Sequence, residues 1–155
     1  MGTINQTTAY MNQQYSDFMV TPDGGMAVKA INNTGSASVK GTVLQAGEVI
    51  FNSTDEQTVQ FDAVAIMYSD GVADGESVWV VTSGKAKVLL EDSTASTLGY
   101  WVFASTQDGR GNATLALPSG GTIGAIDEHF KEIGHCLESV TAGTDQLALC
   151  FIHFN

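Results

Sequence analysis

The stretch from Phe61 to Leu90 constrains this chain most, because it holds three short runs of β-branched and aromatic residues separated by Gly, Asp and Ser. This arrangement predicts a β-meander. In the middle run, Ser77–Thr82, both alternating faces are largely apolar, so the strand needs cover on both sides. A closed barrel, a sandwich or a partner subunit would supply that cover. The dipeptides Asp70-Gly71 and Ser83-Gly84 predict tight turns with a positive φ at glycine.

The charge of the chain limits the partners that it can bind. Its 155 residues suit one domain, and 17 Asp and Glu against 6 Lys and Arg give a formal net charge of −11. Six scattered basic residues cannot line a groove along a phosphate backbone, so we expect no nucleic-acid partner and no anionic membrane partner. No apolar run reaches the roughly 20 residues that span a bilayer. The N-terminus lacks a signal-peptide pattern, so we expect synthesis in a reducing cytosol.

The composition divides the chain into an extended N-terminal arm, residues 1–25, and a β domain, residues 26–155. The first 20 residues are rich in Thr, Asn and Gln with aromatic residues and methionines between them. This fits either an arm that becomes ordered against a neighbour or a frayed terminus. Thr21–Gly25 predicts a turn at the entry to the domain. Short strands then follow one another, with at most one short helix, at Thr122–Lys131. The expected fold class is all-β.

The C-terminal run Leu147–Phe154 is apolar on both alternating faces, which predicts a central strand or a subunit contact. A hairpin centred near Gly143 would place Cys136 roughly opposite Cys150. We expect two buried free thiols there, ahead of a cross-strand disulfide.

Three histidines near the two cysteines raise the question of a zinc site. They are His129, His135 and His153, and no Cys-x-x-Cys or His-x-x-x-His spacing accompanies them. Adjacent residues such as His135 and Cys136 also point to opposite faces of a strand. We therefore expect no metal ligands in this chain.

No motif in the sequence predicts catalysis. The acidic residues of one loop, Asp70, Asp74 and Glu76, do not follow the order of a calcium-binding loop and are typical of solvated turns. There is no nucleophile elbow and no phosphate-binding loop, so we expect no catalytic residue and no cofactor. Tyr100 and Trp101 are typical of a core, with a glycan-binding platform as the alternative.

Four motifs together resemble the small capsid decoration, or cement, proteins of tailed bacteriophages. The shared order is an apolar strand, an acidic glycine turn, a Val-x-Val strand, Ser-Gly and a further strand. A later glycine–aromatic–valine strand, an Ile-Gly pair and a final apolar strand complete it. In this chain the motifs are Phe61–Tyr68, Gly71–Val88, Thr97–Val102 and Ile133–Glu138. The resemblance covers about residues 40–155.

The resemblance implies a small β-barrel-like or β-tulip-like domain on the outer surface of a phage head, commonly as a homotrimer. Its partner would be the major capsid protein of the same virion, and its role would be to stabilise the capsid lattice without enzymatic activity. We expect the arm to contact the capsid through Tyr10, Tyr15 and Phe18. We expect the subunit contact to involve Leu149, Phe151 and Phe154.

Two other classes of function are weighed against this hypothesis. One is a head-fibre or surface module that binds a host receptor or glycan through Trp101 and the loop 107–112. The other is a hydrolase using Asp70, Asp74 or His135. A glycan array would test the first, and a panel of generic substrates would test the second.

Overall fold

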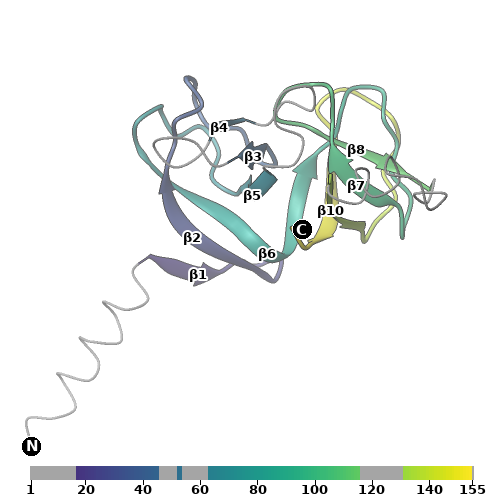
Figure 1. The fold of residues 1–155 in the computed structure, drawn as a ribbon, viewed down its shortest axis with the longest axis horizontal. Helices are drawn as coiled ribbons and strands as arrows, with labels where there is room; N and C mark the ends of the chain where they lie inside the picture. Colours follow the sequence, from purple (N-terminus) through teal and green to yellow (C-terminus); the bar gives the residue numbers. More distant parts are fainter. Residues whose placement is uncertain (1–16, 46–51, 54–62, 116–130, 155) are drawn as a thin grey trace, which may run out of the picture.

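The computed structural model describes residues 17–45, 52–53, 63–115 and 131–154 (Figure 1). The described residues form ten strands in a single sheet and no helix, which confirms the all-β class. Consequently no helix of the described part has the length and apolarity to cross a membrane. The strands are β1 (Phe18–Val20), β2 (Gly25–Ile31), β3 (Val43–Gln45), β4 (Asn52–Ser53), β5 (Ala63–Met67), β6 (Ser77–Leu89), β7 (Trp101–Ala104), β8 (Gly111–Thr114), β9 (Glu132–Cys136) and β10 (Leu147–Ile152).

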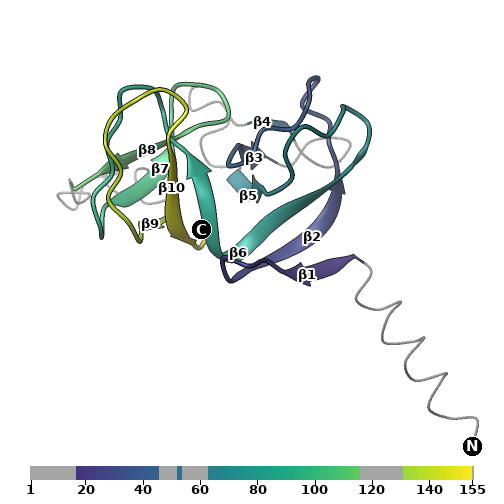
Figure 2. The same ribbon diagram turned by 180° about the vertical axis from the view of Figure 1, so that it is seen from behind.

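Strand β6 joins the two halves of the sheet, as Figures 1 and 2 show from opposite sides. Along one edge of β6, strand β2 pairs with residues 77–84. Along the other edge, β5 pairs with Val80 and Val81, and β10 then pairs with residues 84–89. The segment that the sequence identified as central therefore does organise the fold.

The tight turn predicted at Ser83-Gly84 is wrong, because residues 77–89 form one continuous strand. Gly84 does have a positive φ of 82°, and a Cβ there would lie 2.8 Å from the carbonyl oxygen of Gly24. The glycine thus serves a bend and a close approach of two backbones inside the sheet instead of a chain reversal. At Asp70-Gly71, by contrast, Gly71 has the predicted positive φ, 70°, in the loop between β5 and β6.

Both faces of the first half of β6 are covered, as the sequence predicted. Val78 and Val80 belong to a small core cluster on one face. Val81 belongs to the larger cluster, and Trp79 packs against that cluster. The cover comes from the chain itself, so this strand does not require a partner subunit.

The expected barrel is incomplete in the described part of the chain. The path of hydrogen-bonded strands is β4-β3-β5-β6-β10-β9-β7-β8, with β1 and β2 attached to β6 as a branch. Its last strand, β8, returns to the end of β6 through a single isolated bridge between Leu90 and Gly111. The second half is thus a rolled sheet joined by one bridge, so the described part is all-β without forming a closed barrel.

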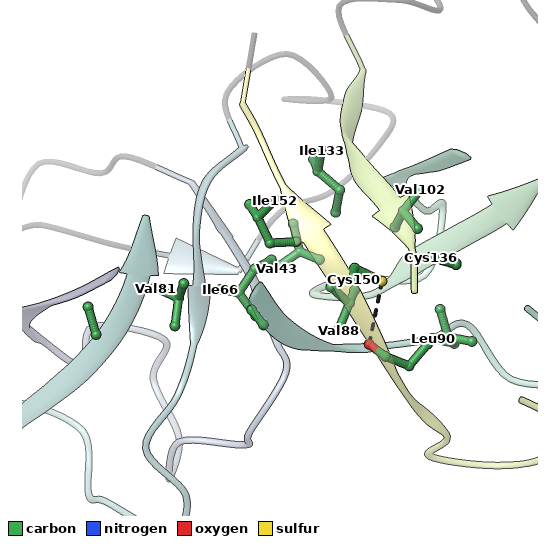
Figure 3. Close-up of a cluster of buried hydrophobic side chains, with 13 residues drawn as sticks. Val43, Ile66, Val81, Val88, Leu90, Val102, Ile133, Cys136, Cys150 and Ile152 are labelled. Atoms are coloured by element: carbon green, nitrogen blue, oxygen red, sulfur yellow. Dashed lines mark hydrogen bonds between the residues drawn. The ribbon is translucent and has the colours of Figure 1, made fainter. Parts of the chain in front are cut away.

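The larger apolar core lines the rolled half and extends to β2, β3 and β5 through Ala27, Val43 and Ile66. Figure 3 shows side chains from β6, β7, β9 and β10 meeting there, among them Val88, Val102, Ile133 and Ile152. All four are at most 1% exposed. Burying side chains of this size stabilises the fold by about 1.5–3 kcal/mol each.

The predicted pairing of the two cysteines is confirmed. Cys136 and Cys150 are direct partners in the register of β9 and β10, and both are buried free thiols. The Cys150 thiol donates a hydrogen bond to the carbonyl oxygen of Ala148, at 3.4 Å (Figure 3). Hydrogen bonding with Cys136, together with burial, raises the pKa of Cys150 far above its usual range. This thiol is therefore protonated and unreactive in the folded protein.

The N-terminal boundary is described only in part. Phe18, Met19 and Val20 pair with β2, so this end of the expected arm belongs to the sheet. The division at residue 25 otherwise stays a prediction. The predicted helix over 122–131 and the expected capsid contacts Tyr10 and Tyr15 lie outside the described residues, apart from Lys131.

Candidate functional site

A row of side chains crosses three neighbouring strands on the outer face of the rolled half. Trp101 of β7 lies opposite His135 of β9, and His135 lies opposite Phe151 of β10. Residues directly opposite in antiparallel strands point to the same face. The ring centroids of Trp101 and His135 are 4.6 Å apart, and Phe151 is 47% exposed. We call Trp101, His135 and Phe151 the outer row.

Strand β10 is apolar on its outward side as well as on its inward side. Its inward residues, Ala148, Cys150 and Ile152, are buried in the core. A central strand with one face in water ordinarily carries polar residues on that face. The outward residues of β10 are instead apolar and partly exposed: Leu147, Leu149 and Phe151.

The three residues expected at a subunit contact do not all lie on the same surface. Leu149 and Phe151 share the outward face of β10. Phe154 follows the strand and packs, partly buried, against the core. Whether any of the three meets a second copy stays a prediction, but only the first two present their side chains on a common outer surface.

Glu138 holds the outward face of β10 against β6. Its Oε1 accepts a hydrogen bond from the Lys87 ammonium group at 2.6 Å and another from the Leu149 N–H at 2.7 Å. The Lys87 hydrogen bond, followed by that of Leu149, lowers the pKa of Glu138 below its usual value of 4.5. Both contacts are stronger with the ionised carboxylate than with the protonated one, so they link the packing of β10 to pH.

Substituting Glu138 by Gln should make the protein less sensitive to acid. A lowered folded-state pKa contributes stability that is complete above the unfolded value and is lost as pH falls through the folded value. We expect the wild type to lose about 1 kcal/mol more unfolding free energy than the variant between about pH 6 and about pH 3. Urea unfolding at the two pH values measures this difference. Glu76→Gln, at an exposed turn position, is the matched control, and an equal effect in both variants would contradict the role of Glu138.

A bulge in β9 places the side chains of Glu132 and His135 on the same face. Against β7, Gly134 pairs with Val102 and Glu132 with Phe103, so Ile133 is the extra residue. In a regular strand Glu132 and His135 would point to opposite faces. The bulge shifts the alternation by one, which leaves Ile133 in the core and turns Glu132 to the side of His135.

The resulting arrangement brings one carboxylate and two imidazoles together. Glu132 Oε1 lies 3.1 Å from His135 Nε2 and 3.2 Å from His153 Nε2. One ligand atom from each residue lies within 4.8 Å of the others. Glu132 is 3% exposed, whereas each imidazole is 37% exposed. We call Glu132, His135 and His153 the histidine–glutamate cluster, and its donor set is one that could hold a metal ion.

Sequence reasoning missed this cluster for a physical reason. The known metal-ligand spacings, such as Cys-x-x-Cys and His-x-x-x-His, are absent here, and a regular β9 would point Glu132 and His135 to opposite faces. The relevant signal is Gly134 between Ile133 and His135, because a glycine inside a strand pattern often marks a bulge. The other two candidates of that reasoning, Cys136 and Cys150, lie in the core.

The acidic residues considered for hydrolysis are not brought to the cluster. Asp70 accepts a hydrogen bond from the Lys40 N–H at 3.0 Å, and Asp74 accepts one from the Gly35 N–H at 2.8 Å. Both carboxylates join the loop after β5 to the loop after β2. His135 lies in the other half of the sheet, so these three residues do not form a common site.

The two residues considered as a glycan platform differ in their surroundings. Tyr100 packs, partly buried, against the core. Trp101 belongs to the outer row and contacts His135. Tyr100 immediately precedes β7 and packs toward the core while Trp101 faces outward, so the two rings do not present one flat surface. Glycan binding stays untested.

Arg110 anchors the loop 107–112 to two neighbouring segments through hydrogen bonds and ion pairs. Its guanidinium donates hydrogen bonds to the carbonyl oxygen of Leu90, at 2.9 Å, and to the carboxylates of Asp92 and Asp145. The side chain is 15% exposed and borders an open groove of about 620 Å³. A guanidinium engaged in this way holds loops together, which leaves it poorly placed to meet a receptor.

Comparisons with known proteins show only distant structural likeness. No family model matches the chain, and no curated protein matches its sequence significantly. Among solved structures, the chain is similar to the head fiber gp8.5 N base in bacteriophage phi29. The TM-score is 0.46 and the sequence identity 16%, over 83% of this chain and 95% of that chain. A likeness of this size carries no argument about family or activity.

Proposed function

We propose that this chain is a non-enzymatic structural protein of a phage virion. It binds the outer surface of the head, associates as a trimer and stabilises the capsid lattice through contacts with the major capsid protein. The class follows from the resemblance of the motifs at 61–68, 71–88, 97–102 and 133–138 to decoration proteins. The choice of binding surface is supported by the side chains that β10 presents on its outward face.

The observation that carries the proposal is the apolar outward face of β10. This strand lies between β6 and β9, yet it places Leu149 and Phe151 away from the core. On β6, Lys87 lies opposite Leu149 and Lys85 lies opposite Phe151. An apolar centre with a charged margin is the usual composition of a surface that binds another protein.

The charge of the chain favours a protein partner. A net charge of −11 repels phosphate backbones and anionic lipid, and it steers the molecule toward a basic protein surface. Within this acidic molecule, the face of β10 stands beside two of the six basic residues, Lys85 and Lys87. The face of β10 therefore combines apolar side chains with two nearby lysines, of which Lys87 is paired with Glu138.

Stabilisation of the head would follow from mass action. A protein that binds the assembled shell and not its separated subunits stabilises the shell by its free energy of binding. Repeating the contact over a symmetric lattice multiplies the effect. Trimeric association would add avidity, because each further subunit binds at high effective concentration.

The variant Phe151→Asp tests the proposal. A charge at the centre of the apolar face should weaken trimer formation, head binding or both by at least about 30-fold, the effect of losing one central interface residue. Sedimentation velocity measures the oligomer, and co-sedimentation with undecorated heads of the same virus measures binding. Leu98→Asp is the control, because Leu98 is 66% exposed and lies outside β10.

Two results would contradict the proposal. The first is a wild-type protein that remains monomeric and does not sediment with heads. The second is a Leu98→Asp variant as defective as Phe151→Asp, which would assign the loss to surface charge in general. Binding of the isolated protein to a host glycan would favour the receptor-binding alternative.

A further inference from the structure

We propose that Glu132, His135 and His153 form a binding site for one divalent transition-metal ion, of which Zn²⁺ is the representative. The site lies on the outer face of the rolled half, beside Trp101. It is independent of the proposed function, since it rests only on the positions and chemistry of these three side chains.

The donor set matches the preferences of zinc. Two imidazole nitrogens and one carboxylate oxygen are a recurrent three-ligand set, in which water or a further ligand takes the fourth position. Tetrahedral zinc holds its ligand atoms at 2.0–2.2 Å, which places them roughly 3.3 Å from one another. The two histidine–glutamate distances are 3.1 and 3.2 Å, and all three atoms lie within 4.8 Å. Because the imidazoles are part-exposed, we expect them to rotate on binding and bring the three atoms to the separations of a tetrahedral site.

The backbone fixes the three ligands before any ion binds. The bulge at Ile133 puts Glu132 and His135 on one face. The His153 N–H donates a hydrogen bond to the Ile133 carbonyl oxygen at 3.1 Å, which holds the end of the chain beside the bulge. A bulge that redirects side chains in this way is a common feature of functional sites.

Electrostatics and access also favour a cation. Glu132 is 3% exposed in a protein of net charge −11, and a buried carboxylate is costly unless positive charge lies close by. A divalent ion bound by the three side chains would add positive charge beside this carboxylate and join β9 to the residues after β10. The imidazoles are 37% exposed, so an ion can reach the site from solvent.

Titration of the full-length protein with Co²⁺ and Zn²⁺ tests the proposal. We expect one ion per chain, with Zn²⁺ displacing Co²⁺. The cobalt spectrum should lack the near-ultraviolet band of thiolate ligation, which excludes Cys136 and Cys150 as ligands. Zn²⁺ should also raise the melting temperature relative to protein treated with a chelator. Acidification should weaken binding, because imidazole binds metals only in its neutral form.

Ligand variants and one control complete the experiment. Loss of a residue that only hydrogen-bonds a metal ligand lowers metal affinity by roughly 10–100-fold. His135→Ala and His153→Ala each remove a ligand itself, so each should lower Zn²⁺ affinity by more than that. Both histidines are part-exposed, so these variants should fold even if Glu132→Gln does not. Glu76→Gln, the exposed carboxylate variant, should bind as the wild type does.

Trp101 supplies a second readout. In a Trp79→Phe background its fluorescence should be quenched by Co²⁺ in a one-to-one titration, because His135 contacts its ring. The proposal is overturned if millimolar Co²⁺ and Zn²⁺ leave the protein unchanged. It is equally overturned if both histidine variants bind as tightly as the Glu76→Gln control.

Discussion

The variant Gly134→Ala should destabilise the protein by about 3–5 kcal/mol, a loss that would unfold many domains of this size. Gly134 has a φ of 155°, and a Cβ built on it lies 2.1 Å from the carbonyl oxygen of Phe151. It also lies 3.0 Å from the Phe151 carbonyl carbon and 3.1 Å from the Cα of Ile152. All three atoms belong to the backbone of β10, so no side chain can move aside. Urea unfolding, or loss of folded protein on expression, measures the effect.

Gly71→Ala is the matched control for this prediction. Gly71 also has a positive φ, 70°, but a Cβ there would meet nothing within 4 Å. Backbone strain alone should therefore cost it roughly 1–2 kcal/mol. If Gly134→Ala and Gly71→Ala lost equal amounts of unfolding free energy, the close approach of the β9 and β10 backbones would be contradicted. A larger loss at Gly134 would support the backbone geometry on which the bulge and the histidine–glutamate cluster depend.

Local patterns predicted the parts of the fold that follow regular alternation. The apolar character of both faces of residues 77–82 predicted a fully covered strand, and Val80 and Val81 are indeed buried in different clusters. The turn near Gly143 set the register that pairs Cys136 with Cys150. In both cases the physical cause lies within a few neighbouring residues, so the sequence alone contains it.

Irregular positions could not be predicted because their causes lie far away in the chain. Ser83-Gly84 has the composition of a turn, but the approach of Gly24 makes it a bend within β6. The histidine–glutamate cluster needs the bulge at Ile133 and also the return of β10, which supplies His153. No motif of fixed residue spacing can predict both the bulge and the position of His153. The sequence therefore identified the apolar outward face of β10 but not the cluster beside it.

Arg110→Ala should cost about 2–3 kcal/mol of unfolding free energy, far more than removing an ordinary surface charge. Its guanidinium is 15% exposed and joins three separate segments through Leu90, Asp92 and Asp145. Asp92 Oδ1 also accepts the Asp145 N–H, at 3.2 Å, which is the main cause of the lowered pKa of Asp92. Without the arginine, two carboxylates would face each other without their shared cation.

The variants Arg110→Lys and Lys29→Ala separate the effect of losing a charge from the effect of losing the guanidinium's hydrogen-bond geometry. Lysine keeps the charge but lacks the planar fork that reaches two carboxylates and a carbonyl oxygen, so Arg110→Lys should recover only part of the stability. Lys29 forms an exposed ion pair with Asp17 at 3.7 Å, and its removal should cost less than about 1 kcal/mol. Thermal or urea unfolding of the three variants ranks them. If Arg110→Ala is no worse than Lys29→Ala, the groove beside Arg110 is held by other contacts, and its guanidinium is available for binding a ligand.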